Sequence, residues 1–159
     1  MLEIKVRNPG AEPTSVKFNG KERLHDGKTF WDRQAPILFP TVGRLRDNKT
    51  VIEGKEYKIP QHGFAKDMDF ELIEKTKNKE IYELKSNEET LKKYPFKFVL
   101  NIEYEFTEDI LSTKIRVINK DDKNMIFGLG GHPGFKLEMP QEEYNSELEA
   151  EEPEVEFME

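Results

Sequence analysis

The chain has 159 residues, with 25 Lys and Arg against 32 Asp and Glu and a formal net charge of −7. Charged residues make up 36% and apolar residues 35% of it, yet 11 Phe, 5 Tyr and one Trp are enough for a folded domain, and the acidic balance argues against nucleic-acid binding. It has no Cys, no apolar run near the roughly 18–20 residues of a membrane helix and no apolar signal segment, so we expect a cytoplasmic protein without disulfides or membrane contact.

Apolar and polar residues alternate through most of the chain, which is the pattern of half-buried β-strands. Turn residues separate the alternating runs, as at Asn19-Gly20, a strong hairpin signal. In chain order, the expected strands cover residues 2–7, 15–18, 51–52, 57–59, 70–74, 80–85, 96–106, 110–118 and 125–129. Many short strands at near-regular spacing predict an all-β antiparallel sandwich or barrel.

One segment has helical character. Residues 87–94 begin at a candidate N-cap, Ser86 or Asn87, and end before Pro95, which disfavours the helical region for the residue that precedes it. We therefore expect at most one short helix. We expect residues 1–140 to form the sandwich portion and the Glu-rich residues 141–159 to form an edge strand or an acidic tail.

Glycine and proline interrupt the strand pattern in three segments, at residues 35–45, 60–68 and 128–135. In the last of these, Gly130-Gly131 permits positive φ or close backbone approach, and Pro133 restricts His132 to an extended conformation. The backbone therefore aims the His132 imidazole.

His62 stands in a similar setting, between Pro60 and Gly63, whereas His25 lies in an ordinary turn. Because imidazole exchanges protons near neutral pH, His62 and His132 are candidate acid–base groups, and the alternative is that each is a loop or core histidine. Arg44, presented by a glycine turn, is either a substrate contact or a surface ion-pair residue. Two histidines without further ligands do not predict a metal site, and no serine-triad or phosphate-loop motif occurs.

Four motifs in order, APILFPTVGRL, PQHGFAKDMDF, SNEETLKKYPFKFVLNIEY and GGHPGF, resemble the aldose 1-epimerase (galactose mutarotase) family, and most of all its bacterial LacX-like branch. The resemblance runs from about residue 2 to residue 135. It implies an antiparallel β-supersandwich and a reaction that interconverts the α and β anomers of an aldose. Because no hydride, acyl or phosphoryl group moves in that reaction, no cofactor is implied.

The resemblance also implies roles for individual residues. His132 matches the general acid that protonates the ring oxygen, and His62 matches a histidine that binds or polarises the same part of the sugar. Arg44 matches an arginine that contacts sugar hydroxyls or a phosphate. Lys66, which replaces the arginine common after HGFA, and Asp67 are further candidate substrate contacts.

Three aromatic residues are candidates to stack on a sugar face. For Phe39 and Phe64 the alternative is a plain core position. Trp31 lies in a polar loop, which favours a sugar contact more than for the two phenylalanines.

The chain departs from the family at its second half. Family members draw a general-base glutamate and a hydroxyl-binding aspartate from that half, and neither has a motif-matched position here. We expect either a shortened version of a longer protein or a natural half, whose uncovered strand faces favour association with a second copy or with the missing half. Three hypotheses stay open: an epimerase, a catalytically silent carbohydrate-binding domain or incomplete fragment, and an enzyme in which His62 is the base and His132 the acid.

Overall fold

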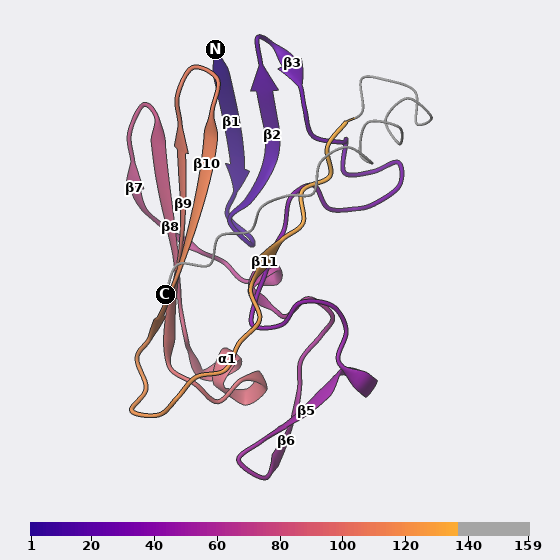
Figure 1. Cartoon of the computed structure of the whole chain (residues 1–159), viewed down its shortest axis with the longest axis vertical. Helices are drawn as coiled ribbons and strands as arrows, with labels where there is room; N and C mark the ends of the chain where they lie inside the picture. Colours follow the sequence, from indigo (N-terminus) through magenta and orange to yellow (C-terminus); the bar gives the residue numbers. More distant parts are fainter. Residues whose placement is uncertain (137–159) are drawn as a thin grey trace, which may run out of the picture.

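The computed structural model describes residues 1–136, which form antiparallel sheets with very little helix (Figure 1). The larger sheet has the order β10-β9-β8-β7. Its strands are β7 (Glu71–Lys75), β8 (Lys79–Lys85), β9 (Phe98–Phe106) and β10 (Leu111–Asn119). The alternation in β9 places one face of the sheet in the core, where Leu100 and Ile102 are fully buried.

The smaller sheet, β1-β2-β3, contains β1 (Leu2–Arg7), β2 (Glu12–Phe18) and β3 (Lys21–Glu22). β2 begins three residues earlier than residues 15–18 predict, and Pro13 lies inside it, opposite Val6. A register shift between Lys5 and Val6 accommodates this proline, which has no N–H to donate to a ladder. Tyr104 of β9 joins the two sheets, because its hydroxyl donates to the Ala11 carbonyl (2.8 Å).

Two small pairings complete the strands. A hairpin joins β5 (Lys49–Ile52) to β6 (Lys55–Lys58), and β4 (Ile37–Leu38) pairs antiparallel with β11 (Gly130–Gly131).

The strand predicted over residues 125–129 is wrong. These residues have irregular structure, and Ile126 is 83% exposed. The reason is the lack of a ladder partner: β4, the strand that this segment approaches, is only two residues long and lies between Pro36 and Pro40. Gly130 and Gly131 were expected to allow a positive φ or a close backbone approach, and neither has a positive φ. A Cβ at Gly130 would meet Val42 Cγ2 at 3.2 Å, so this glycine serves close approach.

The α-helix of the described residues, α1 (Glu88–Lys93), forms where the sequence predicts it. Asn87 is the N-cap: its side chain accepts from the N–H groups of Glu89 and Thr90, while the Thr90 hydroxyl accepts from the Asn87 N–H (2.8 Å). This reciprocal capping satisfies donors that would otherwise lack a partner. No helix within residues 1–136 is long and apolar enough to cross a membrane.

The core lies between the larger sheet and the loops around β4. Phe39 and Phe64 are at most 1% exposed, and their rings pack edge to face with centroids 6.4 Å apart. They are therefore core residues and not stacking platforms for a sugar, so the core alternative is correct for both. Residues 141–159, expected as an edge strand or an acidic tail, lie outside the described residues.

Candidate active site

β4 brings the Gly- and Pro-rich segments together. Ahead of it, the Pro36 carbonyl accepts from the backbone N–H of His132 (3.1 Å). Behind it, Phe39 pairs with Gly63, and the Phe39 carbonyl accepts from the N–H of Phe64 (3.0 Å). Residues far apart in the sequence thus share one short strand, which places His62 and His132 on the same side of it, with ring centroids 5.9 Å apart.

The backbone holds His62 in an unusual conformation. Its φ is +65°, a region that residues with a Cβ rarely adopt. The following residue must be glycine, because a Cβ at Gly63 would lie 2.0 Å from the Phe39 carbonyl oxygen. Two hydrogen bonds to Gly43 stabilise the arrangement: the His62 N–H donates to the Gly43 carbonyl (2.8 Å), and the Gly43 N–H donates to His62 Nδ1 (3.1 Å).

These contacts determine which nitrogen of His62 carries the proton. Nδ1 accepts from a backbone N–H, so the proton of the neutral ring is on Nε2. Gln61 Nε2 lies 3.4 Å from His62 Nε2, a longer contact than the Gly43 bond. Burial lowers the pKa of His62, and the nearby His132 and Lys66 lower it further, so neutral His62 presents an N–H donor.

His132 is more open. Its side chain is exposed, and no hydrogen bond within residues 1–136 holds its ring nitrogens. Both nitrogens are therefore open to hydrogen bonds with a ligand. Trp31 packs against the ring, with centroids 4.9 Å apart and planes at 61°.

The two imidazoles line an open, polar cavity of about 450 Å³. Its wall includes Trp31, Arg33, Gln61, His62, Lys66 and His132. A slightly larger hollow of about 480 Å³ lies between β2 and β10, but it is lined mainly by apolar side chains such as Leu2, Val16 and Leu111. The polar cavity is the candidate active site, because it contains the side chains that can transfer protons. Its volume is that of a small-molecule site.

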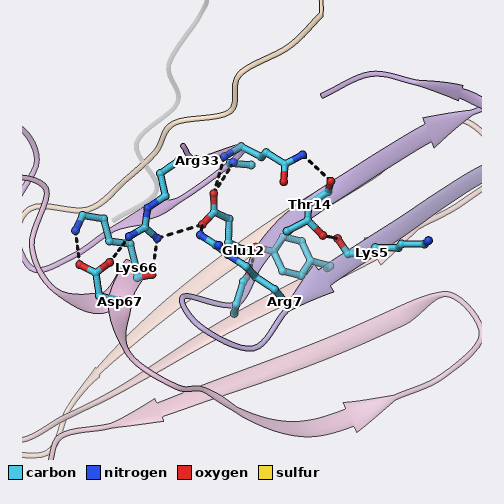
Figure 2. A network of polar contacts seen from close by, with 11 residues as sticks. Lys5, Arg7, Glu12, Thr14, Arg33, Lys66 and Asp67 are labelled. Atoms are coloured by element: carbon cyan, nitrogen blue, oxygen red, sulfur yellow. Dashed lines mark hydrogen bonds and ion pairs between the residues drawn. The ribbon is translucent and has the colours of Figure 1, made fainter. Parts of the chain in front are cut away.

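A buried carboxylate organises one wall of this cavity. Figure 2 shows Glu12 beside Arg33, which in turn reaches Asp67. Glu12 is 0% exposed and accepts from the backbone N–H groups of Gln34 (2.7 Å) and Ala35 (3.1 Å). It therefore fixes the segment that follows Trp31.

Lys66 and Asp67, expected as substrate contacts, have protein partners. The Lys66 ammonium and the Arg33 guanidinium both donate to the Asp67 carboxylate, as Figure 2 shows. Burial would raise the pKa of Asp67, but these two cations outweigh it and hold that pKa below its usual value. Lys66 lines the cavity, whereas Asp67 is not part of the wall that the described residues form, so the structure gives Asp67 the position of a residue that orients Lys66 and Arg33.

Arg44 lies further out. It is exposed and donates to Gln61 Oε1 (2.9 Å), and within residues 1–136 it is Gln61, not Arg44, that lines the cavity. Trp31 lines the cavity, and its contact with a sugar stays a prediction.

Sequence reasoning missed Glu12, Arg33 and Gln61, and it treated His25 as an ordinary turn residue. His25 instead stacks on Trp31, with centroids 5.6 Å apart and planes within 14°. Gln61 adjoins His62, so its place in a glycine-punctuated motif was a usable signal. No local pattern marks the other three, because their partners are distant in sequence.

Comparisons with known proteins identify the family. The family model described as aldose 1-epimerase matches residues 1–158. The plasmid-encoded protein LacX of Lactococcus lactis subsp. lactis is 31% identical over 98% of this chain and 54% of its own length. The chain thus spans about half the length of the curated relatives it matches.

Solved structures show the same fold. A galactose mutarotase related enzyme from Lactobacillus acidophilus superposes with a TM-score of 0.85 and 42% identity, over 89% of this chain and 48% of that one. A galactose mutarotase-like protein from Lactobacillus casei gives a TM-score of 0.83 and 36% identity, over 89% and 49%. The antiparallel galactose mutarotase-like fold is confirmed, and the chain belongs to the aldose 1-epimerase family.

Proposed function

We propose that this chain carries the acid side of an aldose 1-epimerase site and that its ligand is a small-molecule aldose. The observation that carries the proposal is the pair His62 and His132, 5.9 Å apart on a polar cavity of about 450 Å³. Family membership supports the reaction class, and the site's chemistry suits it. No hydride or group transfer is needed, so the reaction runs on positioned proton donors and acceptors.

Anomer interconversion opens the sugar ring and closes it on the other face. Solvent water accepts the proton of the anomeric hydroxyl, since the chain has no motif-matched base. The bond between the anomeric carbon and the ring oxygen breaks, and an acid protonates the ring oxygen. His132, whose nitrogens are free, supplies that proton and takes it back on closure. Neutral His62 donates from Nε2 to the same oxygen region.

The tautomer of His62 argues against the hypothesis that it is the base. A base needs an unshared pair directed at the substrate, and the only unshared pair of the neutral ring accepts from Gly43. The base glutamate of the family has no motif-matched position in this chain. That observation favours a second candidate function, carbohydrate binding without turnover.

The remaining candidates have supporting roles in the proposal. Trp31 and Lys66 contact the sugar from the cavity wall. Arg44 acts through its hydrogen bond to Gln61, and Asp67 orients Lys66.

Polarimetry with freshly dissolved α-galactose and α-glucose tests the proposal. We expect a mutarotation rate above the buffer blank, and a loss of about 10²- to 10⁴-fold of the excess rate in His132→Gln, the usual effect of removing a general acid. Glu3→Gln, exposed in β1, is the matched control and keeps the excess rate. A rate equal to the blank rejects the epimerase function. Sugar binding by NMR titration without excess rate then supports the second candidate, and no binding rejects both.

A further inference from the structure

Four rings form a continuous row that begins outside the proposed acid pair. His25 stacks on Trp31 with centroids 5.6 Å apart, Trp31 meets His132 at 4.9 Å, and His132 meets His62 at 5.9 Å. His62 is held by the backbone of Gly43. His132 has no such hydrogen bond within residues 1–136, so its ring orientation depends on the rings beside it.

His25 is anchored firmly enough to support the row. Its N–H donates to the Gly134 carbonyl (2.9 Å), and its carbonyl accepts from Gln34 Nε2 (2.9 Å). The Gly27 N–H donates to its Nδ1 (3.1 Å), which fixes the ring. Gly134 also donates to the Gln34 carbonyl (2.7 Å), so the loop before β4 and the segment after β11 hold His25 from both sides.

The segment that carries His132 is shaped to admit the His25 ring. A Cβ at Gly134 would lie 2.5 Å from His25 Cδ2, closer than real Cβ contacts come. Glycine at this position therefore lets the His25 ring lie against the backbone two residues beyond His132. The segment from His132 to Gly134 thus has two connections to His25. Gly134 contacts it directly, and His132 is connected to it through Trp31.

His25 interacts through the face of its ring and not through a hydrogen bond of Nε2. His25 Nε2 is buried and has no hydrogen-bond partner within residues 1–136. A buried N–H donor without an acceptor costs free energy of folding, and buried polar groups normally have a hydrogen-bond partner. The absence of an acceptor therefore argues that hydrogen bonding by Nε2 is not the role of His25. Asp26 Oδ1 lies 3.8 Å from Nδ1, and the face of the ring makes a parallel stack on Trp31.

We propose that His25 is a positioning residue of this site, which holds Trp31 against His132 and so orients the imidazole that donates the proton. The inference rests on the proposed function, because it assigns His25 to the same reaction. Aromatic contacts of this kind correspond to about two- to tenfold in a rate or equilibrium. His25 does not line the cavity and acts through Trp31 on the proton donor, so its loss lowers kcat more than it raises KM.

Two substitutions separate the ring from the hydrogen bond. His25→Phe keeps a flat ring and loses the Nδ1 acceptor, whereas His25→Asn keeps an acceptor near the Nδ1 position and loses the stack. Phe30→Ala removes an aromatic ring from the same loop that is 95% exposed, and it serves as the control. If His25→Asn does not fold, Gly134→Ala displaces the His25 ring without replacing it.

The first measurement does not depend on activity. Trp31 is the chain's one tryptophan, so its emission and the ring-proton NMR shifts of His132 report their contact directly. We expect both signals to change in His25→Asn and Gly134→Ala, and to stay near those of the unaltered chain in His25→Phe and Phe30→Ala. Unchanged signals in a folded His25→Asn or Gly134→Ala overturn the proposal, and so does a His25→Phe that behaves like His25→Asn.

The second measurement is mutarotation. A two- to tenfold fall in kcat that exceeds any rise in KM for His25→Asn, restored in His25→Phe, supports the positioning role. If the unaltered chain shows no excess rate while the spectral changes are those expected, the proposed function fails and the ring arrangement stands. A kcat that is the same in His25→Asn as in the unaltered, active chain overturns the positioning role.

Discussion

Replacing Glu12 by alanine is expected to destabilise this protein more than any surface substitution. The Glu12 carboxylate is 0% exposed and accepts from two backbone N–H groups, Gln34 and Ala35, and from two guanidinium groups, Arg7 and Arg33. Alanine removes all of these contacts together. The N–H groups of Gln34 and Ala35 then lose their side-chain acceptor, and Arg33 is left with Asp67 as its countercharge.

The magnitude follows from which of these groups water can reach. Breaking a buried ion pair by removing one partner costs about 3–5 kcal/mol. The Arg7 side chain is 39% exposed and Arg33 keeps its bond to Asp67, so both cations recover part of their share, whereas the half-buried Gln34 and Ala35 lose the acceptor of their N–H groups. We therefore expect about 3–5 kcal/mol for Glu12→Ala and a smaller loss, about 1–3 kcal/mol, for Glu12→Gln, which keeps an acceptor for the backbone.

Urea denaturation followed by circular dichroism measures this loss. At about 2–4 °C per kcal/mol for a chain of this size, Glu12→Ala corresponds to a fall in Tm of about 6–20 °C. Glu3→Ala, an exposed glutamate on β1, should change stability by no more than about 0.5 kcal/mol. A cost below about 1 kcal/mol for Glu12→Ala would refute the reasoning that this carboxylate anchors the cavity wall.

Two further predictions concern the segment around His62. Gly63→Ala should cost more than about 2 kcal/mol by urea denaturation, because its Cβ would meet the Phe39 carbonyl oxygen at 2.0 Å. The control Gly20→Ala has a similar φ but open space around the Cβ, so it should cost only about 1–2 kcal/mol. Equal costs would contradict the steric argument. Burial lowers the pKa of His62 in the folded state, so the unfolded chain binds this proton first as the pH falls below about 6.5. The contribution of neutral His62 to the free energy of unfolding is therefore fully present above that pH. It is lost as the pH falls to the folded pKa. His62→Gln should therefore flatten the fall in unfolding free energy between about pH 7.5 and pH 5, and an identical slope in both proteins would count against it.

Local sequence signals predicted the regular elements well. Residues close in sequence determine the strand over residues 2–7 and the helix near 87–94. The strand follows from period-two alternation, and the helix from Asn87, Thr90 and Pro95. Residues 125–129 have the same apolar character as the true strands and nevertheless form none. Strand formation requires a hydrogen-bonding partner, and two-residue β4 supplies one only for Gly130 and Gly131.

The same distinction holds for the site. Glycine and proline around His62 and His132 act on the adjacent backbone, so their motifs were visible in the chain, and with them the family and its all-β fold. The convergence of those motifs on β4, the burial of Glu12 beneath Arg33, and the stack of His25 on Trp31 are contacts between residues distant in sequence. Backbone conformation is a property of neighbours and can be read locally, whereas an ion pair or a ring contact depends on where two separate segments meet, and only the tertiary structure decides that.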